Sequence, residues 1–566
     1  MRTITGIAAS GGVAVGPIHL HRPVEIDPAS RPAGSVDREL ADLEAAIVDI
    51  DARLADLEES TLGSAGGDAA EIFGVHRMFL ADPSFVDPIR ERIESGVGAA
   101  VAISEGSEQL ASEFEAIGDE YFSQRATDIR DIGTQLLRSV MGVSGSTLSG
   151  LTTTVVIAAH DLTPSDTASI PPGMVAGFIT SVGSATSHTA ILSRAMGVPA
   201  VVGVGEEADL NQGQMVIVDG DDGIVIVDPD AEMLLEAEDR AEVHRRLRAE
   251  ASKSASEPAV TIDGHGVEVV ANIGSAADAA RAVESGAEGV GLLRTEFLFL
   301  DRPTLPDEAT QEADYREIFS HFPDQPVIVR TLDVGGDKEL PSIVIDPELN
   351  PFLGKRGIRL TLAETHLFDT QIRAILRAAA GRSVHIMFPM IGSVSEVVTA
   401  RLEIDRLIGA LDAEGIPRSE DIEIGIMIEV PSAAVMADVL VDHVDFFSIG
   451  TNDLTQYVLA VDRTNPAVAH MADALHPAVL RMIRSVVESA HAKGRWVGVC
   501  GELAGHVDAT EILVGLGVDE LSMSPPSIPL VKQRIRQISR SVAREFAQSV
   551  LDMSGPAEVR NALSGR

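Results

Sequence analysis

The C-terminal half of the chain carries eight short apolar runs in regular succession, and this pattern restricts the fold more than any other feature. The runs are Val267–Ile273, Gly289–Leu293, Val327–Thr331, Val384–Pro389, Ile422–Ile428, Phe446–Ile449, Trp496–Val499 and Glu520–Met523. A segment with helical spacing follows each run, and eight strand–helix repeats over roughly 300 residues are typical of a (β/α)8 barrel. A doubly wound open sheet has the same alternation, so the count alone leaves both folds open.

Side chains able to bind or react stand where the predicted strands end. They are Asn272, Arg294, Arg330 with Asp333, Met390 after Pro389, Glu429, Asn452 with Asp453, Cys500 with Glu502, and Ser524. In a barrel these positions converge on the C-terminal face, where such enzymes place their active sites. Any one of them alone could be a solvated loop residue. Apart from Met390, functional groups recur at seven of eight strand ends, which favours a barrel with an active site.

Four arginines in or near these loops predict a small substrate with several anionic groups. They are Arg294, Arg330, Arg356 and Arg463. Guanidinium groups bind phosphate or carboxylate in a bidentate manner, and a cationic cleft is conspicuous in a chain of net charge −42. A single arginine would most often be a surface ion pair, so the prediction depends on the set. The glycine-rich turn Gly335–Lys338 is a weaker signal of the same kind.

Two carboxylates and one thiol complete the predicted barrel site. Glu429 and Asp453 offer oxygen ligands, and two carboxylates with substrate oxygens are the usual way to hold Mg²⁺. Asn452 could orient the substrate or a metal-bound water. Cys500 is the single cysteine, which excludes an intramolecular disulfide and a multi-cysteine metal site. Such a cysteine is most often inert, but at a strand end a thiol could exchange a proton with bound substrate.

The N-terminal half shows two kinds of sequence pattern. Short β-branched runs with Gly and Pro turns fill 1–24 and 146–229, and Asp219–Gly223 is a hairpin signal. Helical spacing dominates the intervening 33–143, in the segments Val36–Glu58, Asp68–Phe79, Ala99–Phe114 and Tyr121–Val140. We therefore predict a helical domain inserted into an α/β domain. A polar helical linker, 230–258, ending in the flexible Ser252–Pro258, would lead to the barrel domain, 259–566.

Charge and hydropathy exclude several classes of protein. A net charge of −42 argues against binding to nucleic acid or to an anionic membrane. No apolar run approaches the roughly 20 residues of a membrane span, and glycines interrupt the opening segment, so we expect no signal peptide and a soluble, cytoplasmic protein. Only five of the 44 basic residues are lysines, which indicates salt adaptation or the arginine bias of a GC-rich genome.

His188 is the candidate reactive residue of the N-terminal half. Thr186 and Ser187 are good N-cap residues, and Gly197 followed by Pro199 would end the helix that begins at or just after His188. The helix dipole there disfavours a protonated ring, and it stabilises negative charge added to a neutral one. The position therefore suits a phosphoryl acceptor. A histidine simply packed at a helix end is the ordinary alternative, which we retain for His76, His160, His385 and His491.

These residues carry a resemblance that covers essentially the whole chain. Thr186–Thr189 followed by Gly197–Gly203 closely resembles the phosphohistidine segment of enzyme I of the bacterial phosphotransferase system, the phosphoenolpyruvate–protein phosphotransferase family. Other matching segments are Gly6–Ser10, Glu71–Phe73, His76, Asp82–Pro83, Arg125–Asp131, Asp161–Ser165, Leu293–Phe297, Arg330–Lys338, Gly450–Tyr457 and Cys500–Gly505. One departure is Gly183-Ser184-Ala185, where the family usually has a second glycine, so we expect a stiffer loop before His188.

The resemblance implies a fold and a set of roles. The α/β domain would be a swivelling phosphohistidine domain, the helical insert would bind the carrier protein HPr, and the barrel would bind phosphoenolpyruvate and form a homodimer. His188 would be the phosphorylated nucleophile, oriented by Thr167. The substrate would be held by Arg294, Arg330, Asn452, Asp453 and Arg463. Glu429 and Asp453 would ligate Mg²⁺, and Cys500 would handle the proton when enolpyruvate becomes pyruvate.

Two alternatives stay open at this point. Pyruvate phosphate dikinase and phosphoenolpyruvate synthase share the histidine domain and the barrel, but they need a nucleotide-grasp domain for which 566 residues leave no room. A catalytically silent sensor or scaffold that binds phosphoenolpyruvate is the other alternative. The presence of His188, Arg294, Arg330, Glu429, Asp453 and Cys500 argues against it.

Overall fold

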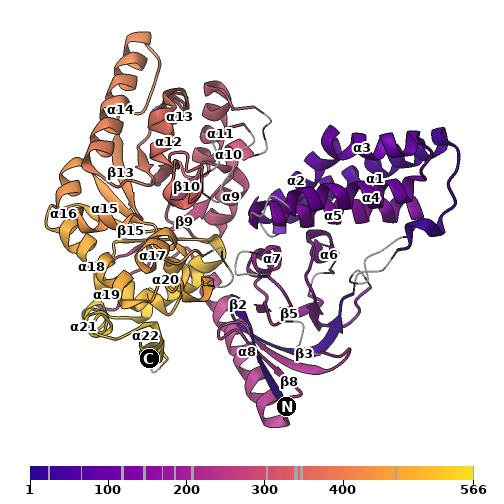
Figure 1. Ribbon diagram of the computed structural model, residues 1–566. Helices are drawn as coiled ribbons and strands as arrows, with labels where there is room; N and C mark the ends of the chain where they lie inside the picture. The colour runs from indigo at the N-terminus through magenta and orange to yellow at the C-terminus, as the bar shows by residue number, and fades with distance from the viewer. Residues whose placement is uncertain are drawn as a thin grey trace. The chain divides into compact units, whose positions relative to one another are not determined.

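The computed structural model divides the chain into two compact units, Met1–Arg246 and Leu247–Arg566, and each is described by itself (Figure 1). The structure describes all residues except 23–25, 65–66, 116–119, 144–147, 149, 169, 172, 184–186, 206–209, 301, 303, 337–341, 344–347, 464, 466–467 and 565–566. For a few others, His188 among them, it describes the backbone alone.

Eight parallel strands of the second unit close into a barrel, which confirms the predicted fold and excludes the open sheet. The strands are β9 (Glu268–Ile273), β10 (Val290–Arg294), β11 (Val327–Arg330), β12 (Val384–Phe388), β13 (Ile422–Ile428), β14 (Phe446–Ile449), β15 (Trp496–Val499) and β16 (Glu520–Met523). They pair in sequence order, and β16 closes the barrel against β9. Every strand lies within a residue or so of its predicted range.

Helices surround the barrel on its outside (Figure 1). They are α9 (Ala276–Glu284), α10 (Phe297–Leu300), α11 (Glu308–Ser320), α12 (Ile358–Ala363), α13 (Thr365–Ala378), α14 (Val394–Glu414), α15 (Pro431–Val435), α16 (Ala437–Leu440), α17 (Thr451–Leu459), α18 (Pro477–His491), α19 (Ala509–Leu516), α20 (Ile528–Gln537), α21 (Arg540–Val550) and α22 (Pro556–Leu563). Alternate strand residues face these helices, while the others fill the barrel interior.

The single tryptophan lies in the barrel wall, at the start of β15. The ring of Trp496 stacks on Phe446 of β14 with a centroid distance of 4.5 Å, and its Nε1 donates to Glu423 Oε2 at 3.3 Å. The neighbouring interior residues are Leu292, Ile328, Met387, Met427 and Cys500. Aromatic and sulfur-containing side chains thus fill the space that the strands enclose.

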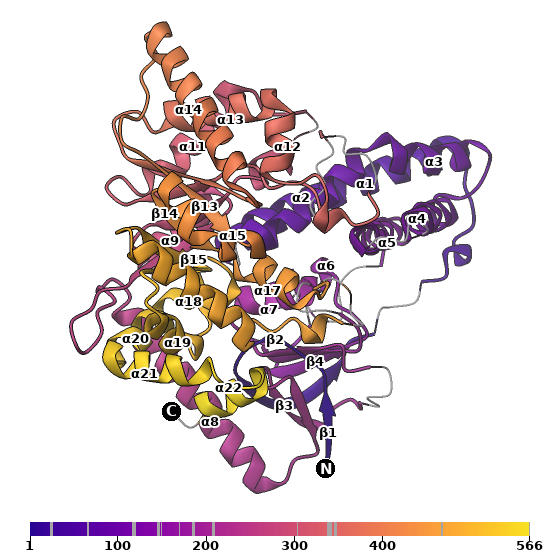
Figure 2. The same cartoon turned by 60° about the vertical axis from the view of Figure 1, so that its left-hand side comes forward.

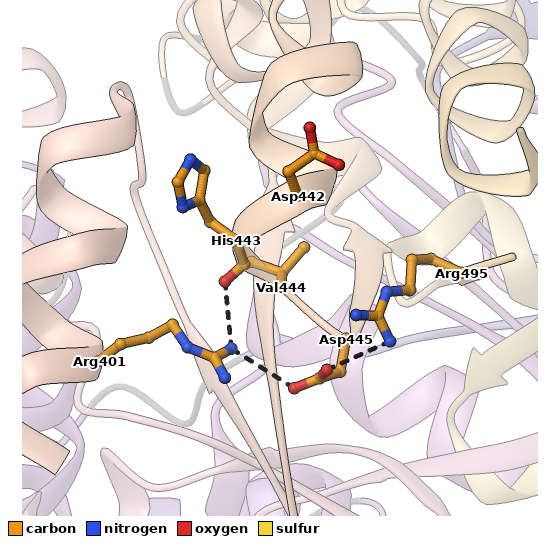
Figure 3. Close-up of a pocket in the computed structure, with 6 residues that line it drawn as sticks. All are labelled: Arg401, Asp442, His443, Val444, Asp445 and Arg495. Atoms are coloured by element: carbon orange, nitrogen blue, oxygen red, sulfur yellow. Dashed lines mark hydrogen bonds and ion pairs between the residues drawn. The ribbon is translucent and has the colours of Figure 1, made fainter. Parts of the chain in front are cut away.

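A cavity of about 170 Å³ lies at the start of β14, opposite the strand ends that carry the predicted site (Figure 3). Arg401 Nη1 donates to the carbonyl of His443 at 3.1 Å and to Asp445 Oδ2 at 3.4 Å, and Arg495 reaches Asp445 Oδ1 at 3.3 Å. The same Asp445 carboxylate accepts from the Ile424 N–H at the start of β13. We interpret this cluster as a structural tie between neighbouring strands.

Glu520 at the start of β16 is a buried carboxyl group. Its Oε1 has no hydrogen-bond partner among the described residues. Gly498 on β15 leaves it space, because a Cβ there would lie 2.7 Å from Oε1. Burial, and then the carboxylates of Glu268 and Asp519, raise the pKa of Glu520 to about 8. Glu520 is therefore a neutral acid at pH 7.

Replacing Glu520 with glutamine should remove a pH-dependent loss of stability. A carboxyl whose folded-state pKa lies above its unfolded value contributes fully below the unfolded pKa of about 4, and loses that contribution as the pH rises toward 8. Relative to Glu520→Gln, the parent should lose up to about 1.4 kcal/mol of unfolding free energy per pH unit in this window. Urea unfolding across the window measures the difference, and a difference independent of pH would contradict the prediction.

The first unit contains an eight-stranded mixed sheet in the order β1-β8-β7-β3-β4-β5-β6-β2. The strands are β1 (Arg2–Thr5), β2 (Ile7–Ser10), β3 (Val13–Leu20), β4 (Val155–Ala159), β5 (Val175–Thr180), β6 (Ala200–Val202), β7 (Met215–Asp219) and β8 (Ile224–Val227). The predicted hairpin at Asp219–Gly223 joins the antiparallel strands β7 and β8. Helices α6 (Pro164–Ala168) and α7 (His188–Met196) belong to the same unit.

Five helices are inserted between β3 and β4 and pack around a core of their own (Figure 2). They are α1 (Val36–Ser64), α2 (Gly67–Ala81), α3 (Pro83–Glu94), α4 (Ala99–Glu115) and α5 (Glu120–Met141). The sequence predicts four of them. It misses α3, whose Asp82 N-cap accepts from the Ser84 N–H and whose interior contains Pro88.

Helix α8 (Ala231–Lys253) crosses the division between the two units. The segment Ser252–Pro258, predicted as a flexible hinge, begins inside this helix. Arg536 of α20 donates to the Glu257 carbonyl at 3.0 Å and to Ser254 Oγ at 2.9 Å. These bonds attach the segment to the barrel unit, and the division falls earlier, at 246/247. The domain limits given above stay predictions.

Candidate active site

Arg294 and Arg330 end two neighbouring barrel strands and are paired in register. Arg294 of β10 lies opposite Arg330 of β11, so both side chains leave the same face of the barrel wall. Arg330 is 5% exposed; its guanidinium pairs with Glu296 and lies 3.1 Å from Asp333 Oδ2. Burial opposes its charge, but the Glu296 and Asp333 carboxylates outweigh burial and raise the pKa of Arg330 above its usual range. Arg330 is a permanently charged anchor.

Arg356 lies fully buried beside Asp333 and a further carboxylate, Asp453. Its Nη2 is 3.1 Å from Asp333 Oδ2 and 3.3 Å from Asp453 Oδ2. Gly335 has φ +105°, and a Cβ there would lie 2.6 Å from the Cβ of Arg356, so glycine is required for this close approach. The rest of the predicted turn, Asp337 and Lys338, lies outside the described residues.

Glu429 and Asp453 add two carboxyl groups to this cationic cluster. Glu429 follows β13 and accepts from the Met390 N–H at 2.6 Å, and Asp453 lies in the first turn of α17. Burial, and then repulsion by Asp453 and Asp333, raise the pKa of Glu429 above its usual range. Arg463 Nη2 lies 3.6 Å from Asp453 Oδ1, so this arginine also belongs to the cluster.

The two carboxylates fit a divalent cation that substrate oxygens help to ligate. Their repulsion is relieved when a cation lies between them, and Mg²⁺ prefers oxygen ligands. Among the described residues no group of three or more His, Cys, Asp or Glu side chains is placed to hold a metal ion. Glu429 and Asp453 are the two residues here that would hold such a cation, and its binding stays a prediction.

Cys500 and Asn452 occupy the ends of the two following strands. Cys500 is 3% exposed, and burial raises the pKa of its thiol to about 11, so the group is protonated at neutral pH. Its carbonyl accepts from Asn272 Nδ2 at 2.9 Å, while Asn272 Oδ1 accepts from Ser522 Oγ at 2.6 Å. Asn452 Oδ1 accepts from the Glu502 N–H at 2.9 Å and so links α17 to the loop after β15.

His188 begins helix α7 in the first unit, as predicted. Ser187 caps the helix through its side chain, which accepts from the Ala190 N–H, and Gly197 ends it with φ +65°. Thr167 lies buried on α6, which packs against α7, and its Oγ1 donates to the Thr163 carbonyl at 3.3 Å. The His188 side chain and Ser184–Thr186 lie outside the description, so the Thr167–His188 bond and the effect of the loop departure stay predictions.

Three contributors to the barrel site were not predicted from the sequence. Glu296 pairs with Arg330, Tyr457 accepts from Arg356 Nη1 at 3.5 Å, and Gln371 contacts the loops after β10 and β11. Glu296 and Tyr457 lie within segments that resemble the family, close in sequence to Arg294 and Asp453. This closeness was the sequence signal that could have identified them as site residues. The one sequence feature that could have identified Gln371 is its position as a polar residue on the apolar face of a predicted helix.

Comparison with known proteins accounts for both units. Residues 248–540 match the family model described as PEP-utilising enzyme, PEP-binding domain. Residues 5–125 match the N-terminal domain of PEP-utilising enzymes, and residues 151–223 match their mobile domain. The barrel, the mixed α/β sheet and these matches define a multidomain PEP-utilising enzyme.

Curated relatives align with the whole chain. Phosphoenolpyruvate-protein phosphotransferase of Priestia megaterium is 44% identical over 560 residues, covering 99% of this chain and 98% of that protein. The protein of the same name from Bacillus subtilis (strain 168) is 42% identical over 565 residues, with coverage of 99% and 98%. The chain belongs to the phosphoenolpyruvate-protein phosphotransferase family and is an enzyme. None of its described helices combines the length and apolar character needed to cross a membrane.

Proposed function

We propose that this enzyme transfers the phosphoryl group of phosphoenolpyruvate to its own His188 and then to a histidine of the phosphocarrier protein HPr. This is the first step of the sugar phosphotransferase system, and we place it in the cytoplasm. The observation that carries the proposal is the register pair Arg294–Arg330 beside Glu429 and Asp453, on a chain that also presents His188 at a helix start. Phosphoryl transfer needs such charge neutralisation and in-line placement more than covalent machinery.

In the first half-reaction Arg294, Arg330 and Arg463 would hold the substrate phosphate, with Asn452 and the Asp453 backbone on the rest of the substrate. Glu429 and Asp453 would hold Mg²⁺, which supplies charge neutralisation on the phosphate oxygens when bound. A ring nitrogen of His188 forms a bond to phosphorus as the bond to the enol oxygen breaks. Thr167 would orient the ring.

Cys500 would complete the conversion of enolpyruvate to pyruvate. The leaving group is an enolate, and its methylene carbon must gain one proton. The thiol of Cys500 is protonated at neutral pH because burial raises its pKa to about 11, so it can donate that proton. In the reverse direction the thiolate would remove a proton from the methyl group of pyruvate.

The second half-reaction requires His188 to leave the barrel and meet HPr. His188 and the arginine cluster lie in different compact units, so the histidine must move between two partners. The helical insert α1–α5 would dock the carrier, and the barrel would form the homodimer. A chain of net charge −42 would attract a carrier with a basic face, most strongly at low salt.

The test is to incubate the protein with phosphoenolpyruvate carrying a labelled phosphoryl group and with Mg²⁺, alone and with HPr. We expect label on His188, located by peptide mapping, and its passage to HPr. Label that stays on the enzyme would support a scaffold or another acceptor. A requirement for ATP would support the dikinase alternative. Absence of any label would refute the proposal.

The proposed Mg²⁺ ligands can be tested separately. Replacing Glu429 with alanine removes one of two carboxylates, so the Mg²⁺ concentration for half-maximal labelling should rise at least about tenfold. Titration of labelling rate with Mg²⁺ measures it. Glu423→Ala, a half-exposed glutamate on the same strand, is the matched control. Unchanged metal dependence in Glu429→Ala would refute the ligand role.

A further inference from the structure

We infer that Gln371 is a positioning residue that sets the spacing between the two phosphate-binding arginines. It lies on α13, outside the barrel, and touches neither arginine side chain in the described contacts. The inference rests on the proposed function, because it concerns how Arg294 and Arg330 are held for phosphoenolpyruvate. It is drawn from one buried hydrogen-bond network behind the strand ends.

The amide of Gln371 contacts both strand-end loops at once. Its Nε2 donates to Thr295 Oγ1 at 3.0 Å, directly after Arg294 at the end of β10. Its Oε1 accepts from the Leu332 N–H at 2.9 Å, two residues after Arg330 on β11. A single planar group thus bonds to both loops and helps to set the distance between them.

The network continues to the backbone of Arg330 itself. Thr295 Oγ1 accepts from Gln371 and donates to the Arg330 carbonyl at 2.8 Å. The second N–H of Gln371 donates to Tyr315 Oη on α11 at 3.1 Å. Thr295, Gln371 and Tyr315 are all buried, at 2% exposure or less, so water does not substitute for these bonds.

Packing alone does not explain why α13 carries an amide at this buried position. Burying an amide on the apolar face of a helix is unfavourable unless all its groups are bonded, and a leucine or methionine would pack there without partners. The amide instead uses both N–H groups and its carbonyl, and two of the three bonds end at the loops of Arg294 and Arg330. The chemistry of the site explains why an amide is present.

The effect on catalysis follows from the strictness of phosphate recognition. Two guanidinium groups bind a phosphate together only when their separation matches its oxygens. Loss of the amide removes its two bonds to the loops after β10 and β11, and leaves the Thr295 bond to the Arg330 carbonyl and the strand pairing to hold them. A displacement of an ångström in a positioning group lowers rates by about tenfold to a hundredfold. The loss should appear with phosphoenolpyruvate and not with HPr, because in the proposed function the carrier meets His188 away from the barrel site.

The experiment compares Gln371→Met with Gln311→Met in the full chain. Gln311 is a matched control, because it is equally buried, lies on α11, and among the described residues its side chain bonds to the Pro306 carbonyl alone, at 2.9 Å. We expect Gln371→Met to lower kcat/KM for labelling by phosphoenolpyruvate about ten- to a hundredfold. Transfer from the phosphorylated enzyme to HPr should change less than about twofold in either variant. Equal losses in both half-reactions, or equal losses in both variants, would indicate a merely structural role and overturn the inference.

Thr295→Val provides a second variant that preserves shape and removes the linking hydroxyl. If both residues act through one hydrogen-bond chain, the loss of kcat/KM in the double variant should be no larger than the loss in the less active single variant. Multiplied losses would overturn the inference.

Calorimetric binding of phosphoenolpyruvate, measured in parallel, separates this inference from the proposed function. If the unsubstituted protein binds phosphoenolpyruvate but takes up no labelled phosphoryl group, the proposed function is refuted. A weaker affinity of Gln371→Met for phosphoenolpyruvate would still support the positioning role. A parent that neither binds nor is labelled overturns both.

Discussion

His188→Ala should take up no label from phosphoenolpyruvate, and it should transfer none to HPr. The effect is complete because the substitution removes the atom that would bond to phosphorus, and a neighbouring water does not replace a nucleophile that must carry the group to a second protein. Helix α7 should persist, because its cap belongs to Ser187, whose side chain accepts from the Ala190 N–H. Gel autoradiography reports the label, and circular dichroism reports the fold.

His160→Ala is the matched control for this experiment. His160 is an exposed histidine of the same unit, directly after β4, and its removal should leave labelling within about twofold of the parent. Label retained on His188→Ala would refute the nucleophile assignment and direct attention to another histidine.

Arg330→Lys should lower kcat/KM for phosphoenolpyruvate by about a hundredfold to a thousandfold. A lysine retains the positive charge but presents a single point where the guanidinium presents a planar fork, and the second contact to the phosphate is lost. The charge that remains can still pair with the buried Glu296 and Asp333, so the unfolding free energy should fall by no more than about 1–2 kcal/mol. A methionine would remove a cationic partner from both carboxylates, with Arg356 still beside Asp333, and should destabilise the barrel more than lysine does, by about 3–5 kcal/mol.

Arg373→Lys controls for the substitution itself. Arg373 also bridges two carboxylates, Glu308 and Glu414, each at 2.8 Å, but it does so on the outside of the barrel. Its replacement should leave kcat/KM within about twofold. If Arg330→Lys retains the parent kcat/KM, its guanidinium does not bind the transferred phosphate.

Periodicity made the barrel predictable, because a strand buried on both faces is a short apolar run whose limits are set by the first polar residue. Ile422–Ile428, Phe446–Ile449, Trp496–Val499 and Glu520–Met523 were predicted to the residue, even though some of these mainly apolar runs include a polar residue, such as Glu423 or Glu520. Helix α3 was not predicted, because Pro83 and Pro88 read as breakers. Pro83 stands in the first turn, where the missing N–H is harmless.

The site was predictable where chemistry stands at a strand end, as at Arg294, Arg330, Glu429 and Cys500. It was not predictable where a contact joins distant elements. Gln371 meets Thr295 across 76 positions of sequence, and nothing in the local pattern of α13 specifies that meeting. Arg356 was noticed only as a charge near a loop, and its full burial between Asp333 and Asp453 depends on the closed barrel.

The position of Trp496 makes intrinsic fluorescence a selective probe. The chain has one tryptophan, and its indole lies in the barrel wall against Phe446 and Glu423. Selective excitation of tryptophan therefore records the melting of the barrel unit and is silent about the unit that carries His188. Circular dichroism records both. Denaturation followed by the two signals will separate the stabilities of the two units without cutting the chain, and ligands can be assigned to a unit by the signal that they shift.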